Sequence, residues 1–199
     1  MELERTTGGY ALKKALTALD TFTLEFTAIL DALDLRYVLV GGYLAILFGR
    51  SRSSEDIDLF LAPQTPTEFR RLWTALVTAG WWCLNTDDPA DAYHAYLAAH
   101  VPIRFAHADQ TLPNMEVKFP RIALDSWALE NRQPVQLNDR TIWIAPHELG
   151  IAYKLYMGSD KDIEDARHLY TLLTPYLDEK LLASFARKLQ IPDRLGVLR

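Results

Sequence analysis

The sequence predicts an α/β fold of the mixed α+β kind with a helical C-terminal extension. Over about residues 1–145, apolar segments of strand length alternate with segments whose apolar side chains recur at helical spacing. From Pro146 onward, every apolar segment has helical spacing. The 199 residues are 49% hydrophobic and 24% charged, as in a globular chain of one domain or one domain with a small appendage. We therefore expect a core at 1–145 and a helical appendage at 146–199.

Helices and strands are expected to interleave through the core. Apolar side chains at helical spacing from Leu12 to Leu33 predict a first helix that ends near Asp34. Thr65 and Glu68 form a capping-box pattern around Pro66, which predicts the start of another helix. The other expected core elements are strand 37–40, helix 43–48, strands 56–61, 81–84, 101–105 and 115–119, and a hairpin at 134–144 that turns at 138–139.

The C-terminal part is expected to contain three helices, near 146–157, 160–174 and 177–190. Ser159 or Asp160 is the expected N-cap of the second. No apolar run is long enough to span a bilayer, and the N-terminus lacks the pattern of a signal peptide, so we expect a cytoplasmic protein without a membrane segment. Because Cys83 is the only cysteine, the chain can form neither an internal disulfide nor a cysteine-based zinc site.

The charge of the chain argues against general nucleic-acid binding. A formal net charge of −5 does not provide the concentrated basic face that phosphate neutralisation needs. A local basic groove stays open as an alternative, with Arg50, Arg52, Arg70, Arg71, Lys118 and Arg121 as its candidates. His94, His100 and His107 are spaced six or seven residues apart, which is not a helical metal-ligand spacing.

Two carboxylates within an expected strand are the first sign of chemistry. Asp56 and Asp58 are two residues apart, so their side chains should lie on the same face of the strand. Keeping both ionised requires a nearby cation, and carboxylate oxygens suit Mg²⁺. Upstream, a strand that ends at Gly41 and Gly42 and enters a helix lets the backbone approach a phosphate. The alternative is an ordinary glycine turn beside a solvated edge strand.

The combination of these motifs resembles the nucleotidyltransferase superfamily typified by DNA polymerase beta. An apolar strand with Gly41 and Gly42, a gap over 43–55 and then Asp-Ile-Asp-Leu match its pattern. Arg52 and Ser53 are similar to the approach to the aspartates in antibiotic-modifying and toxin-type members. The resemblance implies a mixed sheet flanked by helices, a nucleoside triphosphate (NTP) as substrate, and one or two Mg²⁺ ions. It also implies that the glycine turn, Arg52 and Ser53 contact the nucleotide.

The superfamily pattern implies a third carboxylate on a neighbouring strand. Glu116 in "NMEVKF" is the best candidate for a metal ligand, because a glutamate within an apolar alternation needs a reason to be there. Lys118 lies on the same expected strand face and offers the alternative of an ion pair with Glu116. Asp109 is a weaker candidate among loop-forming residues.

The segment 146–173 resembles the C-terminal motifs of nucleotidyltransferase toxins from abortive-infection toxin–antitoxin systems. That resemblance implies that Lys154 contacts nucleotide phosphates and that Asp162 or Asp165 is the acidic member of the motif. The toxin pattern usually has an arginine before its Lys-Asp pair, a place filled here by 158–160. Alternatively, Lys154 extends to solvent and Lys161 forms an ordinary helical pair with Asp165.

Together the motifs predict transfer of a nucleoside monophosphate from an NTP to an acceptor hydroxyl. The toxin-type resemblance implies tRNA or another RNA as acceptor and a cognate antitoxin as partner. Similarity to aminoglycoside nucleotidyltransferases implies a small-molecule acceptor, and a protein acceptor is a third alternative. A nucleotidyltransferase-fold binding module without activity is the non-enzymatic alternative.

Overall fold

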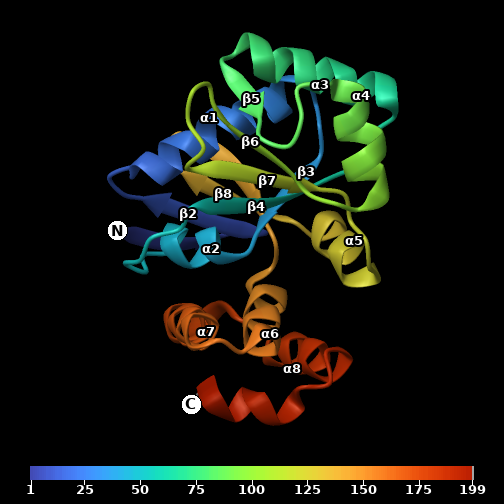
Figure 1. Ribbon diagram of the computed structural model, residues 1–199. Helices are drawn as coiled ribbons and strands as arrows, with labels where there is room; N and C mark the ends of the chain where they lie inside the picture. Colours follow the sequence, from blue (N-terminus) through green and yellow to red (C-terminus); the bar gives the residue numbers. More distant parts are fainter. Residues whose placement is uncertain (199) are drawn as a thin grey trace.

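A computed structural model describes residues 1–198, in which helices surround one mixed sheet of nine strands (Figure 1). The strand order is β1-β2-β8-β9-β3-β4-β7-β6-β5. The strands are β1 Glu2–Thr6, β2 Gly9–Lys13, β3 Tyr37–Val40, β4 Asp56–Leu61, β5 Trp81–Cys83, β6 Ile103–His107, β7 Asn114–Lys118, β8 Gln133–Leu137 and β9 Arg140–Ile144. The α-helices are α1 Ala18–Ala32, α2 Gly42–Leu47, α3 Pro66–Thr78, α4 Pro89–Asp91, α5 Ala123–Glu130, α6 His147–Met157, α7 Asp160–Leu173 and α8 Glu179–Lys188. The predicted mixed α/β fold is confirmed.

The two faces of the central strands have different environments. Ile57 of β4 pairs with Met115 of β7, which pairs with Phe105 of β6, and all three are buried. On that face, Phe105 contacts Phe26 of α1 and Trp73 of α3. The alternate residues of the same strands therefore point away from α1 and α3, toward the side where α5 and α6 lie (Figure 1).

Sequence periodicity located most elements but was wrong at the N-terminus. Residues 9–13 form β2, which pairs with β1 and β8, and α1 begins only at Ala18 after the cap residue Thr17. Tyr10 and Leu12 are both buried, at 2% and 0% exposure, as period-two alternation in a strand requires. Leu12 also fits the helical spacing of the apolar residues in α1, and this coincidence produced the error. The capping box at Thr65 and Glu68 is confirmed.

Helices α7 and α8 both pack on α6, and α7 also packs on α2. Ser159 caps α7 by accepting a hydrogen bond from the backbone N–H of Asp162. His168 of α7 donates a hydrogen bond to the carbonyl of Phe48, at the end of α2, at 3.0 Å. This contact places α7 next to the C-terminal end of α2. No helix within residues 1–198 is long and apolar enough to cross a membrane.

Candidate active site

A row of charged side chains crosses the face of the sheet opposite α1 and α3. Asp58 of β4 pairs with Glu116 of β7, which pairs with Arg104 of β6, and Arg104 donates a short hydrogen bond to Glu116 Oε2. The strand alternation that buries Ile57 on the other face turns these charges toward the same side.

Lys118 connects the two carboxylates of this row. Its ammonium lies 2.8 Å from Asp58 Oδ1 and 3.3 Å from Glu116 Oε1. Burial alone would lower the pKa of Lys118, but the charges and hydrogen bonds of Asp58 and Glu116 outweigh burial and raise this pKa above its ordinary value. The ion pair between Glu116 and Lys118, which the sequence left as an alternative, is therefore present.

Asp56 shares the strand face of Asp58 and is the more exposed of the two. Within residues 1–198, its carboxylate has no hydrogen-bond or ion-pair partner. In the same part of the chain, no group of three or more Asp, Glu, His or Cys side chains is arranged to hold a metal ion. Two adjacent carboxylates nevertheless fit Mg²⁺, which proteins commonly bind through one or two carboxylates together with substrate phosphates.

The glycine turn lies directly against Asp58 and Arg52. Gly41 has a φ of +74°, and a Cβ atom at this position would overlap Oδ2 of Asp58. A Cβ atom at position 42 would overlap Nη2 of Arg52. Gly41 therefore needs to be glycine, because of its positive φ and the contact with Asp58, whereas a side chain at position 42 would displace the end of the Arg52 side chain.

Asp165 of α7 forms ion pairs with three cationic side chains from other segments of the sequence. It is fully buried and accepts hydrogen bonds from Arg52 Nε and Nη2, both at 3.0 Å. Lys154 Nζ lies 3.0 Å from Oδ2, the oxygen that also accepts from Arg52 Nη2, and Arg50 forms a further short ion pair with Oδ1. Burial alone would raise the pKa of Asp165, but the hydrogen bonds from Lys154 and Arg52 lower it below its ordinary value.

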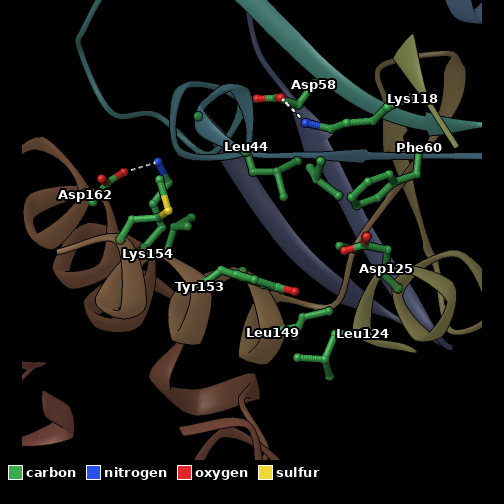
Figure 2. Close-up of a pocket in the computed structure, with 18 residues that line it drawn as sticks. Leu44, Asp58, Phe60, Lys118, Leu124, Asp125, Leu149, Tyr153, Lys154 and Asp162 are labelled. Carbon is green, nitrogen blue, oxygen red and sulfur yellow. Dashed lines mark hydrogen bonds and ion pairs between the residues drawn. The ribbon is translucent and has the colours of Figure 1, made fainter. Parts of the chain in front are cut away.

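A cavity of about 310 Å³ opens between this charged face and the C-terminal helices (Figure 2). Asp58 and Lys118 lie at one end and Lys154 at another, where Lys154 bonds to Asp162 at 2.7 Å. The remaining lining is mainly apolar and includes Leu44, Phe60, Leu124, Ala128, Leu149, Tyr153 and Met157. The cavity thus joins a polar end, suited to phosphates, to an apolar part.

Tyr153 and Asp125 bring polar groups into the apolar part of the cavity (Figure 2). Within residues 1–198, the Tyr153 hydroxyl has no hydrogen-bond partner. Burial and the charge of Asp125 raise the pKa of Tyr153 to about 12. The hydroxyl is therefore protonated at neutral pH and able to donate a hydrogen bond.

Five of the ten site residues selected from the sequence line this cavity, whereas Asp56 and Glu116 do not. Gly41, Gly42, Asp58, Lys154 and Asp162 line it, while Arg52 and Asp165 lie behind the glycine turn. Ser53 instead lines a second hollow of about 400 Å³, which Arg52 and the first residues of α1 also line. Asp109 lies in the turn between β6 and β7 and does not line the cavity.

The predicted basic residues do not form a single groove. Arg70 and Arg71 are exposed on α3, on the other side of the sheet, whereas Arg50 and Arg52 are engaged by Asp165. Sequence reasoning missed Arg104 as a partner of Glu116. The signal that selected Glu116 would have found it, since Arg104 is also a charged residue between apolar neighbours on a strand.

No model of a known protein family matches the chain, and no curated protein sequence matches it. Solved structures do match. An antigenic nucleotidyltransferase-like protein from Paracoccidioides brasiliensis aligns with a TM-score of 0.56 and 16% identity over 92% of this chain and 94% of that one. ANT(2'')-Ia in complex with adenylyl-2''-tobramycin aligns with a TM-score of 0.51 and 16% identity over 86% of this chain and 99% of that one.

A solution structure of the antibiotic-resistance factor ANT(2'')-Ia gives a similar result, with a TM-score of 0.51 and 15% identity over 92% of this chain and 96% of that one. The three alignments cover 86–92% of this chain. At this level of identity they establish the architecture. The chain has a nucleotidyltransferase-like fold.

Proposed function

We propose that the protein is a Mg²⁺-dependent nucleotidyltransferase that transfers a nucleoside monophosphate from an NTP to an acceptor hydroxyl. The observation that carries this proposal is the contact of Asp58 and Arg52 with the glycine turn at the mouth of the cavity. One carboxylate of the proposed metal-binding pair and a guanidinium suited to phosphate thus flank one stretch of backbone. The nucleotidyltransferase-like fold supports the same reading.

Different residues would hold the metal ion and the phosphates of the triphosphate. Asp56 and Asp58 would hold Mg²⁺, which supplies Lewis-acid stabilisation of charge on the phosphate oxygens. Arg52 and Lys154 place positive charge on the other side of the turn, where phosphate oxygens accept charge-assisted hydrogen bonds. Asp162 and Asp165 hold these cations in place when no nucleotide is bound.

In the proposed reaction, the acceptor oxygen forms a bond to the α-phosphorus as the bond from that phosphorus to the bridging oxygen of the β-phosphate breaks. Pyrophosphate leaves with the electron pair, and the proton of the hydroxyl is released to water. The protein residues contribute by aligning the two oxygens and by balancing the charge of the leaving group.

RNA is the first acceptor class to test, on the strength of the C-terminal motif of toxin-type enzymes, and such an enzyme would have a cognate antitoxin. A hydroxyl-bearing small molecule is the second candidate. The charges that line the cavity favour it, because Asp58, Asp125 and Asp162 outnumber Lys118 and Lys154. The neighbour bound to adenylyl-2''-tobramycin supports this alternative.

A label-transfer experiment tests the proposal. The purified protein is incubated with Mg²⁺, NTPs labelled at the α- or γ-phosphate, and separately RNA, aminoglycosides or the protein alone. We expect α-label, without γ-label, on one acceptor class. Asp58→Asn should abolish transfer, whereas Asp139→Asn, the same chemical change at the exposed β8–β9 turn, should not.

Each outcome has a defined meaning. Transfer of γ-label would indicate a kinase-like reaction and contradict the proposal. Label on RNA or on an aminoglycoside would decide between the two acceptor classes. Absence of label on every acceptor, together with no Mg²⁺-dependent nucleotide binding, would identify a binding module without activity.

A further inference from the structure

We propose that Lys118 occupies the place of a second metal ion, so that the site binds a single divalent cation through Asp56 and Asp58. Glu116 then belongs to a charge network and is not a metal ligand. This inference rests on the proposed nucleotidyl transfer, and it assigns Lys118 as a resident cation of that site.

The position of the Lys118 ammonium is the first observation. It lies between Asp58 Oδ1 and Glu116 Oε1, at 2.8 and 3.3 Å, and the lysine lines the cavity. Figure 2 shows the Lys118 side chain extending toward Asp58 at the polar end of the cavity. A metal ion shared by Asp58 and Glu116 would need this same space, and its charge would repel the ammonium.

The state of Glu116 is the second observation. Lys118 contacts its Oε1 and Arg104 contacts its Oε2, so both carboxylate oxygens already have a cationic partner. The residue is also 9% exposed. To become a metal ligand, Glu116 would have to give up at least one of these ion pairs in a largely buried position, where an unpaired charge is costly.

The remaining oxygen donors define where one cation fits. Asp56 has no side-chain partner within residues 1–198, and Asp58 Oδ2 faces the Gly41 turn with no ion pair. These oxygens are on one strand face, two residues apart. The three carboxylates carry three negative charges, of which Lys118 and Arg104 offset two, so one divalent ion with the substrate phosphates is enough to complete the site.

Counting bound Mn²⁺ by electron paramagnetic resonance tests this assignment without measuring activity. The probe is Mn²⁺ titrated into the full chain saturated with a non-hydrolysable α,β-methylene ATP. We expect one bound Mn²⁺ per chain in the wild type and two in Lys118→Met, because that change frees Asp58 Oδ1 and Glu116 Oε1. The double variant with Lys118→Met and Glu116→Gln should return to one, and Lys180→Met, an exposed lysine on α8, should stay at one.

A second variant covers the case in which Lys118→Met fails to fold. Glu116→Gln alone should leave the Mn²⁺ count at one and weaken binding less than Asp58→Asn does, because in this assignment only Asp58 donates an oxygen to the ion.

The failures of the two proposals are distinguishable. Two Mn²⁺ ions in the wild type, a Lys118→Met variant that folds and stays at one, or a loss of affinity in Glu116→Gln as large as that in Asp58→Asn would overturn the role of Lys118 and leave nucleotidyl transfer standing. No bound Mn²⁺ in the wild type, with or without the nucleotide, would overturn the metal-dependent function itself and the assignment of Lys118 with it.

Discussion

Replacing Asp165 with asparagine should destabilise the protein by about 3 kcal/mol, since removing one partner of a buried ion pair costs about 3–5 kcal/mol. The carboxylate is fully buried and is the common acceptor for Arg50, Arg52 and Lys154. An amide keeps the shape of the side chain but removes the charge that these three cations share. It also brings an N–H donor toward groups that can only donate.

The magnitude lies at the low end of this range because the cations keep other acceptors. Their side chains are 16%, 9% and 14% exposed for Arg50, Arg52 and Lys154, so some water reaches each. Arg52 also donates to the carbonyl of Ser53 at 2.9 Å, and Lys154 contacts Asp162 at 2.7 Å. In Asp165→Asn, the three cations therefore lose one partner each, but none becomes an isolated buried charge.

Urea denaturation at pH 7 measures the effect, and Glu164→Gln is the matched control. Glu164 pairs with Arg50 from the same helix but is 63% exposed, so its loss should cost less than about 1 kcal/mol. Because the pKa of Asp165 is lowered in the folded state, its contribution is present above the unfolded value of about 3.9 and is lost as the pH falls through the folded pKa. If both variants lose the same free energy of unfolding at pH 7, Asp165 is not the common acceptor that stabilises the three cations.

Two further predictions concern the glycine turn and a buried histidine. Gly41→Ala should reduce label transfer more than tenfold, because the added Cβ displaces Asp58. Gly80 also has a positive φ, but a Cβ atom there would have nothing within 4 Å. Gly80→Ala should therefore cost only about 1 kcal/mol of stability and leave transfer unchanged. Equal transfer in the two variants would contradict this prediction. His147 is fully buried, and burial, followed by the charge of Arg5, lowers its pKa to about 3. The unfolded chain takes up a proton near pH 6.5 that the folded chain does not, so stability should fall by about 2 kcal/mol between pH 6.5 and 5. Urea denaturation at both pH values checks this, and His147→Leu should remove the loss; an unchanged slope in that variant would count against it.

Features that depend on neighbours in sequence could be predicted. The face shared by Asp56 and Asp58 follows from strand periodicity alone, and the start of α3 follows from Thr65 and Glu68. The β1–β2 hairpin was missed because Leu12 fits both the helical period of α1 and the period-two alternation of a strand. The pairing of Leu12 with Leu137 of β8 decides in favour of the strand, and sequence periodicity does not show that pairing.

Partnerships between distant segments could not be predicted in the same way. The pattern around Glu116 marked it as functional, but its role depends on Arg104 and Lys118, which the register of β6 and β7 brings together. Likewise, Arg52 and Asp165 are 113 residues apart, and no local pattern pairs them. Charge in an apolar strand indicates that a partner exists, but the partner is fixed by strand order and helix packing.

The contacts around the glycine turn imply that the two motifs form one physical unit. Asp58 lies against Gly41 and Arg52 against Gly42, and Arg52 is held by Asp165 of α7. The expected boundary near residue 145 marks where the apolar pattern of the sequence changes, but residues from both sides of it form the site. A chain ending there would leave Arg52 without its buried carboxylate, and the guanidinium would lose the partner that fixes it against the turn. In the proposed reaction, the C-terminal helices would therefore position the side of the turn that faces the phosphates, and the sheet, through Asp56 and Asp58, would supply the side that faces the metal.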